Sequence, residues 1–478
     1  MKGNDSAPLT DQNIRSVFDG AGDFVARDLC CNGFSVHAYM IDGLVAGGSI
    51  AEYVLRPMTK LLDGATMEEL YHQALTGKVY SAVAAPCKDL DTVVKKLVNG
   101  FCVVLFPGVG AVGFEAKTGE KRGLSAPAVE NTVKGPKDAF TETSRTNTSL
   151  IRRHLRTPDL RLYETQVGRR SLTNVSVAWI DGLTDPKLVE RMKQRLASID
   201  IDGMLSPASV EEYVTGSRAT AFPLLQFTER ADKFCQGLLD GRVGLIVDGL
   251  PLGYLAPVDL NYFLSSPEDR GTDYVSATCI RVLRYGALLL SLLLPGLYVA
   301  MATFHQAMIP LPLLRSMIES KESVPFSSTM EVLGLLLAFE LLQESGIHLP
   351  QSIGQAVSII GGIVVGTAAV EAKLVSPAAL IVVSLAGICG FALPNRDFTE
   401  AVRLWRLGMT VLSSVAGLFG LTVGLIALII HLAGLTSMGV AYLAPFSRIR
   451  GVQLYRSRLT NQKYRDPALH PRDRKNQR

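Results

Sequence analysis

Four stretches in the second half of this 478-residue chain contain no Asp, Glu, Lys or Arg, at residues 285–314, 345–370, 374–395 and 407–447. Because about 20 apolar residues of helix span the hydrocarbon core of a bilayer, each stretch can contain a membrane-spanning helix. We therefore predict an all-α polytopic membrane domain over residues 281–447. Its expected spans lie near residues 285–304, 353–370, 374–393 and 407–432.

Two further segments of this domain affect the number of crossings. A short apolar stretch near residues 331–343, with Glu331 and Glu340 at its flanks, is predicted to be re-entrant or interfacial because it is too short to cross. The run 407–447 would exceed about 55 Å as one helix, so we expect it to break near residues 434–439. Four crossings follow from this interpretation, and six are the alternative.

The two ends of the chain predict its orientation. Residues 448–478 form a basic tail, which the positive-inside rule places in the cytoplasm. Residues 1–29 are polar and acidic without the apolar core of a signal peptide, so we expect a polar N-terminal tail on the same side. The seven cysteines form neither a CxxC pair nor an even framework, which favours a reducing compartment.

The first half of the chain contains two similar segments. The sequence VHAYMIDGL at 36–44 returns as VSVAWIDGL at 175–183, and the apolar run 100–108 has a counterpart at 241–249, both about 140 residues further on. Each copy combines a short apolar strand, a helix-like stretch and an apolar hairpin. We therefore predict an α/β cytoplasmic region of two related subdomains, residues 30–127 and 165–280, joined by a linker over 128–164.

Signatures of catalysis and nucleotide binding are weak. Gly108, Gly110 and Gly113 match GxGxxG after a strand, but a polar, glycine-broken segment follows where a dinucleotide site needs a helix. We interpret them as a β-hairpin turn. The chain has no HExxH, GxSxG or P-loop motif and its seven histidines are scattered, so we predict no enzyme activity, cofactor or metal site.

A basic stretch in and beside the linker has two interpretations. It could bind anionic lipid headgroups or nucleic acid. We favour a solvated or salt-bridged helix face, which is the commoner role of such a run. The residues concerned are Arg145, Arg152, Arg153, Arg156 and Arg161.

Small residues recur along two of the expected spans. Their spacing puts them on one helix face and lets helix backbones approach closely, in an oligomer or in a simple bundle. The first stripe consists of Gly354, Ser358, Gly362 and Gly366, and the second of Ser413, Gly417, Gly420 and Gly424.

Ionisable and polar groups at membrane depth are costly, so they indicate ion paths or subunit contacts. Glu340 is the strongest candidate, because Glu371 and Lys373 share a tight hairpin from which they would reach an interface. The other candidates are His305, Gln306, Gln355, Ser358, Thr367 and His431.

An ordered series of motifs runs through both halves of the chain. GPKDAFTE at 135–142 is followed by RTNT at 145–148 and LIRR at 150–153, with further motifs at 228–230, 266–269, 304–310, 339–342 and 353–361. Together these motifs resemble the GerA family of spore germination proteins, with departures at Ala231 and Ala307. The positions that match the family are Gly135, Pro136, Asp138, Phe140, Thr141, Glu142, Arg145, Thr146, Asn147, Arg152, Arg153, Glu229, Arg230, Glu268, Asp269, His305, Gln306 and Pro310.

The resemblance implies the A subunit of a nutrient germinant receptor in the inner membrane of an endospore, with both termini cytoplasmic. Such a subunit would act with a permease-like B subunit and a lipoprotein C subunit, as a homo-oligomer in contact with membrane lipid and without nucleic acid. It would conduct or gate ions. Within this hypothesis we expect the span 353–370 to pack near the oligomer axis. The alternative is an accessory scaffold or signal amplifier of the stage V AF type, without a nutrient response of its own.

Overall fold

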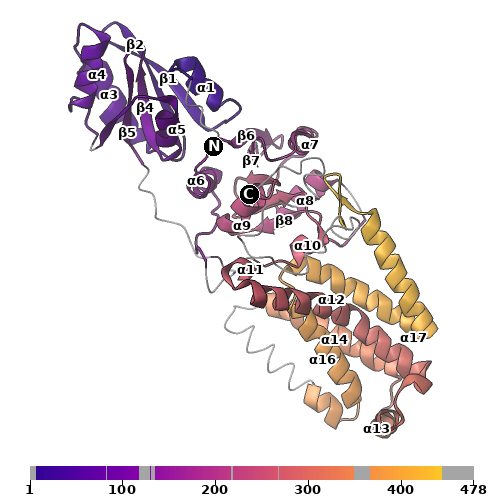
Figure 1. The fold of residues 1–478 in the computed structure, drawn as a ribbon. Coiled ribbons are helices and arrows are strands. Elements are labelled where there is room, and N and C mark those ends of the chain that lie inside the picture. Colours follow the sequence, from indigo (N-terminus) through magenta and orange to yellow (C-terminus); the bar gives the residue numbers. More distant parts are fainter. Residues whose placement is uncertain are drawn as a thin grey trace. The chain divides into compact units, whose positions relative to one another are not determined.

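The computed structural model describes residues 7–81, 83–117, 127, 130, 135–216, 219–266, 268–348 and 366–443. These residues fall into two compact units (Figure 1). The first takes in the described parts of Met1–Ser217 and Leu225–Pro257, and the second those of Arg218–Leu224 and Val258–Gln462. The first unit contains two α/β subdomains and the second is almost entirely helical, which confirms the predicted fold class.

The first subdomain is a five-stranded antiparallel sheet, in the order β1-β2-β4-β5-β3, with helices on both faces. Alternate residues of β4 belong to two different cores: Val104 packs with residues of α3 and α4, and Val103 packs with residues of α1 and α5. Both faces of this strand are therefore apolar. The elements are α1 (Asp11–Val17), β1 (Phe24–Cys31), β2 (Phe34–Ile41), α2 (Gly47–Ile50), the π-helix η1 (Ala51–Leu55), α3 (Arg56–Lys60), α4 (Met67–Leu75), β3 (Ala84–Cys87), α5 (Leu90–Val98), β4 (Phe101–Phe106) and β5 (Gly110–Glu115).

The second subdomain repeats this topology, with its sheet in the order β6-β7-β9-β10-β8. The two copies also share an equivalent backbone hydrogen bond. Asp42 N donates to Asp23 O at 2.8 Å in the first copy, and Asp181 N donates to Asp159 O at 2.8 Å in the second. The sequence repeat is therefore a structural repeat. Its elements are α6 (Ser144–His154), β6 (Leu160–Val167), β7 (Thr173–Ile180), α7 (Pro186–Ala197), α8 (Pro207–Thr215), β8 (Gln226–Thr228), α9 (Ala231–Leu239), β9 (Val243–Val247) and β10 (Gly253–Ala256).

The subdomain boundaries differ from those expected. The residues expected to form a polar tail contain α1 and most of β1, and Ile14 and Phe18 are buried in the first subdomain. The expected linker contains α6 and the start of β6. Because α1 packs on α5 as α6 packs on α9, each repeat begins with a helix of its own.

The glycine-rich motif of the first subdomain forms a hairpin. β4 and β5 are antiparallel neighbours that pair Phe106 with Gly110, and Gly108 in the turn has a φ of 82°. A positive φ favours glycine at this position. The predicted β-hairpin is confirmed.

Among its described residues, the second unit contains two helices, α12 and α17, that are long and apolar enough to cross a membrane by length and composition. The shorter α16 is also apolar. The elements of this unit are α10 (Leu260–Phe263), α11 (Glu268–Gly271), α12 (Tyr274–Thr303), the 3₁₀ helix η2 (Gln306–Met308), α13 (Leu311–Lys321), α14 (Ser328–His348), α16 (Pro377–Phe391), α17 (Arg396–Gly434), β11 (Thr436–Ser437) and β12 (Val440–Ala441).

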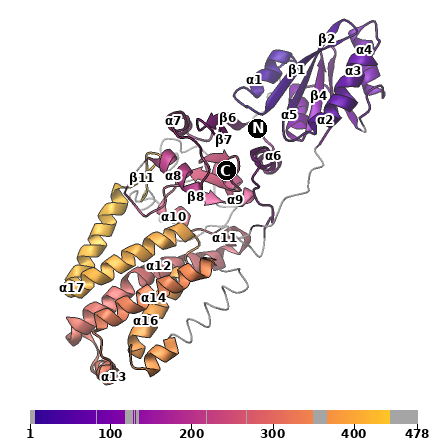
Figure 2. The same ribbon diagram turned by 180° about the vertical axis from the view of Figure 1, so that it is seen from behind.

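α17 is a pair of helical arms that fold back on each other at Gly417. This residue has a φ of 61° and a ψ of −140°, which are not helical. A Cβ on Gly424 would lie 3.2 Å from Met409 Cγ, although these residues would be about 22 Å apart along a straight helix. The expectation of one continuous span over 407–432 is therefore wrong, and Figures 1 and 2 show the two arms meeting at an acute bend.

The remaining expected segments fit in part. The apolar stretch near 331–343 lies inside α14, a helix of 21 residues, and is therefore longer than the short segment predicted. α16 lies within the expected span 374–393. Most of the expected span 353–370 lies outside the described residues, and so does the basic tail 448–478.

Candidate functional site

Glu340 joins α14 to the first arm of α17. Its two carboxylate oxygens accept one ion pair each, from Arg403 and from Arg406, both at 2.9 Å. Arg406 is 2% exposed and Glu340 is 34% exposed. Gln343, one turn further along α14, also contacts the Arg403 guanidinium. We call Glu340, Gln343, Arg403 and Arg406 the α14–α17 charge cluster.

This cluster lies between the ends of the helical bundle. α12 and the first arm of α17 run side by side in the same direction. Gly296 of α12 lies beside Ser413 of the arm, since a Cβ on Gly296 would be 2.9 Å from Ser413 Oγ. At the ends of both helices, a Cβ on Gly417 would be 2.9 Å from Phe304 Cβ. Between Arg406 and Gly417 the arm rises about 17 Å. The charges are therefore well away from the bend, among apolar helices, where an unpaired charge is costly.

Two carboxylates face the arginines of this cluster. Both guanidinium groups pair with Glu340, and Arg403 also lies 3.8 Å from Glu400. The Nε atoms of Arg403 and Arg406 have no hydrogen-bond partner among the described residues. Glu340 was predicted from the sequence, whereas both arginines were missed. Their position one turn apart, directly before the charge-free run 407–447, is the signal that could have identified them.

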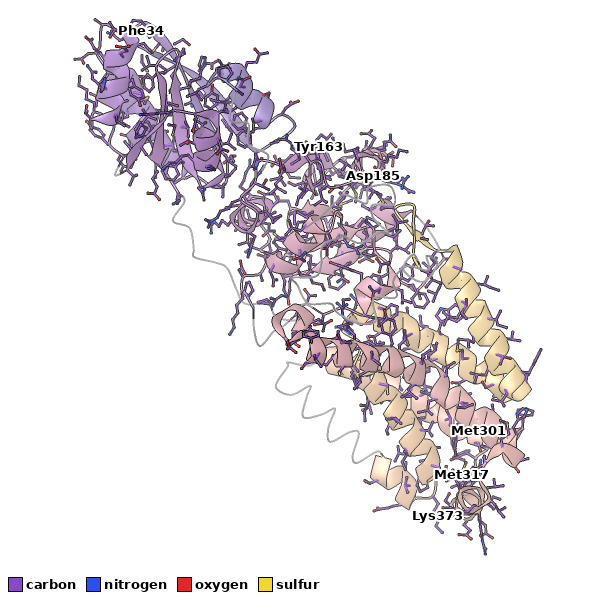
Figure 3. The ribbon with its side chains drawn as sticks, viewed as in Figure 1. Phe34, Tyr163, Asp185, Met301, Met317 and Lys373 are labelled. Atoms are coloured by element: carbon purple, nitrogen blue, oxygen red, sulfur yellow. The ribbon has the colours of Figure 1, made fainter. Side chains whose placement is uncertain are left out.

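A second buried carboxylate links α13, α14 and α16. The side chain of Glu331 is fully buried, pairs with Lys321 at 3.3 Å and accepts a hydrogen bond of 2.8 Å from Ser376 N. Ser376 is the N-cap of α16, so Glu331 supports the start of that helix. From the sequence, Glu331 was predicted only as a charged residue at the flank of an apolar stretch. Figure 3 shows Met301 of α12, Met317 of α13 and Lys373 at the same end of this unit.

A third charged group lies at the start of α12. Asp269 is 2% exposed and pairs with Arg284 at 2.8 Å and with Arg281 at 3.3 Å. Arg284 also donates to Leu264 O at 3.1 Å. Asp269 thus fixes the chain that leads into the first long apolar helix, while its neighbour Glu268 is half-buried in α11.

The GPKDAFTE motif packs against the second sheet. Phe140 is buried, meets the ring of Phe234 edge-on at 5.4 Å, and its backbone N donates to Glu229 O at 2.8 Å. The buried Arg230 donates to Pro136 O at 3.1 Å and makes two hydrogen bonds to Asp232. These contacts position the chain and present no reactive group.

The same motif also prepares the start of α6. Asn147 Oδ1 accepts from Thr141 N at 2.8 Å, and Asn147 Nδ2 donates to Thr141 O at 2.6 Å. Glu142 O accepts from Gly249 N at 2.7 Å. Asp138 pairs with His154 at 2.7 Å, and the exposed Gly135 opens the segment with a φ of 153°.

The basic stretch around α6 is largely engaged in ion pairs and hydrogen bonds. Arg152 forms two hydrogen bonds of 2.7 Å to Asp23, and Arg145 pairs with Asp42 at 2.9 Å. Arg161 donates to Val17 O at 3.1 Å, and Arg156 donates to Asn99 Oδ1 at 3.3 Å. These contacts agree with the salt-bridged helix face. Thr146 is exposed and Arg153 is half-buried on the same helix.

The residues predicted after α12 surround the bend of α17. His305 approaches Gly417, where a Cβ would lie 2.9 Å from His305 Cε1. Gln306 is exposed and its side chain donates to Ala302 O at 2.9 Å, while the exposed Pro310 is the N-cap residue of α13. His431, at the end of the second arm, lies 2.9 Å from the Thr220 hydroxyl.

One member of the first small-residue stripe, Gly366, lies within the described residues. Gly366 is buried and a Cβ there would lie 3.6 Å from Leu380 Cδ2 of α16, and Thr367 is exposed. The other members of the stripe and its polar neighbour lie outside the described residues: Gly354, Gln355, Ser358 and Gly362.

The described residues offer no group of His, Cys, Asp and Glu side chains arranged to hold a metal ion. Burial raises the pKa of the Cys31 thiol to about 11 and that of Cys102 to about 12. Burial also raises the pKa of the Cys235 thiol. These three thiols stay protonated at neutral pH, and a thiol is a poor nucleophile in that form.

The chain matches the family model of the Bacillus/Clostridium GerA spore germination protein over residues 12–468. This chain belongs to the GerA family. The match includes residues from both units, as the ordered motifs indicated.

Individual relatives in this family cover most of the chain. It is 34% identical over 442 residues to the uncharacterized membrane protein YfkQ of Bacillus subtilis, which covers 91% of this chain and 86% of that protein. It is 36% identical over 411 residues to spore germination protein KA of the same species, covering 85% of this chain and 75% of the relative. Spore germination protein B1 of Bacillus subtilis is 31% identical over 423 residues, which covers 87% of this chain and 86% of that protein.

One solved structure is similar to the first unit. It is the N-terminal domain of the A subunit of the Bacillus megaterium spore germinant receptor GerK3, with a TM-score of 0.40 and 27% identity. The similarity covers 52% of this chain and 92% of that domain.

Proposed function

We propose that this GerA family member is the A subunit of a nutrient germinant receptor that helps to trigger endospore germination. The observation that carries the proposal is the family match, which spans both the α/β and the helical unit. The relatives include spore germination proteins of two Bacillus species, Bacillus subtilis and Bacillus cereus. As partners we propose a permease-like B subunit and a lipoprotein C subunit.

The helical unit is the proposed membrane domain, in the inner membrane of the spore with both chain termini on the cytoplasmic side. α12 and α17 have the length and composition of membrane helices. Two arms of α17 that each cross would raise the expected number of crossings from four to five, and a crossing α14 would complete the six-crossing alternative. The first unit, with its two α/β subdomains, would then lie in the cytoplasm.

Within this membrane domain, a homo-oligomer would conduct or gate ions. The α14–α17 charge cluster supports this role, because ionisable groups among the apolar helices of a membrane domain are costly and mark ion paths or subunit contacts. We propose neither a catalytic activity nor a cofactor, and no nucleic acid as a partner.

Ion flux from the purified full-length chain tests the proposal. The chain is reconstituted into liposomes loaded with rubidium, alone and with its B and C subunits, and its mass is measured in the same detergent preparation. Rubidium release above that of empty liposomes, from an oligomer of defined mass, supports a conducting subunit. A well-folded oligomer that releases none in any combination overturns conduction and leaves the accessory scaffold.

A further inference from the structure

Helix α13 has an apolar face that the helical unit covers only in part. At about 100° per residue, Leu311, Leu314 and Ile318 share one side of this helix. No residue of α13 is fully buried, and Leu311 and Ile318 are 77% and 58% exposed. The apolar face is therefore open along much of its length.

The opposite face of α13 is polar. Arg315 and Glu319 form an exposed ion pair at 3.1 Å, one turn apart, and Ser316 is exposed beside them. A helix with one apolar and one polar face suits a boundary between an apolar medium and water.

One edge of α13 is fixed to the rest of the unit. Met317 packs against a cluster from α12, α14 and α16 that includes Val299 and Val332. Lys321, at the end of the helix, pairs with the buried Glu331 at 3.3 Å. These contacts hold the helix in place without covering Leu311 or Ile318.

α13 follows the point where the first long apolar helix ends. From Tyr285 to Thr303, α12 rises about 27 Å, close to the thickness of about 30 Å of a hydrocarbon core. The charge-free run continues beyond α12 as far as Leu314, and Phe304 and Met308 in the connection are exposed. An apolar segment of this kind directly after a spanning helix lies at the boundary of the membrane.

The direction of α13 also fits this boundary. Figures 1 and 2 show α13 nearly end-on, whereas α12 runs across the picture, so the axis of α13 crosses that of α12. With 11 residues, α13 is about 17 Å long and too short to span a bilayer. A short helix that crosses the direction of a spanning helix runs along the membrane surface.

We propose that α13 is an interfacial helix that binds the lipid surface of the membrane. Leu311 and Ile318 lie about 5–10 Å deep, among the upper parts of the acyl chains, while Arg315 and Glu319 face water. Because the charges of this pair cancel, apolar contact holds the helix, and zwitterionic lipid is sufficient. The placement rests on the membrane domain of the proposed function and adds a lipid contact to it.

The test places a tryptophan on either face of α13 in the full-length chain, with W179F and W405F removing the two native tryptophans. I318W and L311W report on the apolar face, and S316W on the opposite face is the matched control. Each variant is reconstituted into phosphatidylcholine liposomes whose acyl chains are brominated near the headgroup, and iodide is the aqueous quencher. We expect bromine to quench I318W and L311W at least about threefold more than S316W, and iodide to quench S316W more than either.

Two further variants separate the possible failures. L289W in α12 and I426W in α17 replace exposed residues of the proposed spanning helices, and lipids brominated at the chain ends should quench them. If no brominated lipid quenches either variant, the membrane domain itself is overturned, and this placement with it. If both are quenched but I318W and L311W respond to iodide as S316W does, only the placement of α13 is overturned.

A protein partner on the apolar face of α13 would give a different result. I318W and L311W would then be protected from bromine and from iodide alike, which overturns a lipid contact. Circular dichroism melting verifies the fold of each variant. Since the substituted positions of α13 are exposed, we expect the melting curve of the tryptophan-free parent.

Discussion

Arg152 donates two hydrogen bonds of 2.7 Å to the carboxylate of Asp23, 129 positions earlier in the chain, and both side chains are almost completely buried. The pair joins α6 of the second repeat to the start of the first sheet. Removing one partner of such a pair leaves the other charged and buried. The contact between the repeats therefore depends on it.

R152M should lower the stability of the first unit by about 3 kcal/mol, because Asp23 would remain as a buried charge. Trp179 on β7 reports unfolding of this unit in a W405F background, since the chain has two tryptophans. R156M, at an exposed neighbour, is the control and should change little. An R152M denaturation midpoint equal to that of R156M would contradict the prediction.

E340Q should destabilise the α14–α17 contact, because two arginines lose their shared carboxylate. The expected loss is about 2 kcal/mol, below the usual range for buried pairs because Glu340 is partly exposed. Thermal melting in detergent, followed by Trp405 fluorescence, measures it. E319Q breaks an exposed pair with Arg315 and serves as the control. The double variant E340Q/R406Q should melt closer to the wild type than E340Q does.

G417A should prevent the normal fold of the second unit. An alanine there would need a φ of 61° with a ψ of −140°. Its Cβ would lie 2.9 Å from both Phe304 Cβ and His305 Cε1. The matched variant G408A lies in the same helix with nothing within 4 Å and should be neutral or stabilising by up to about 1 kcal/mol. Yield and melting temperature of the two purified variants provide the comparison. Equal behaviour would show that the bend is not required.

F140A should cost about 3 kcal/mol, because it removes a buried ring that packs edge-on against Phe234. Trp179 fluorescence during denaturation measures the loss. T146A, at an exposed position of α6, is the control. A small effect of F140A combined with lost germination would instead assign the motif a direct functional role.

The first unit should lose stability as the pH rises above about 9. Burial raises the pKa of Cys102 from 9.0 to about 12, so the unfolded chain releases this proton at a lower pH than the folded chain. The stabilisation is complete below pH 9 and declines towards pH 12, by up to about 1.4 kcal/mol per pH unit for each such thiol. C102A should flatten the decline in chemical denaturation between pH 8 and pH 10, and an unchanged slope would refute the assignment.

The sequence predicted what local patterns encode. The repeated VHAYMIDGL and VSVAWIDGL strands and the hairpin around Gly108 depend on neighbouring residues, and each was found where expected. The helix at Ile14 and Phe18 was missed because acidic residues around it dominate the composition of the segment. Which partners Glu340 selects depends on contacts more than sixty positions away, and no local pattern contains them.

Gly417 was selected from the sequence for the wrong reason. A small residue every three or four positions is typical of a straight packing face, and the same residues also suit a tight reversal. Gly420 and Gly424 do face a neighbouring helix, but that helix is the preceding arm of α17. Only the backbone angles at Gly417 separate the two possibilities.

A reversal made by one residue also leaves α17 without a connecting loop. Loops are where chains tolerate insertions, epitope tags and protease cleavage. The bend of α17 offers none of these, because both arms continue as helix up to Gly417. Any lengthening there would separate Gly420 and Gly424 from the residues they now touch, so we expect insertions in this region to be tolerated only at its two ends.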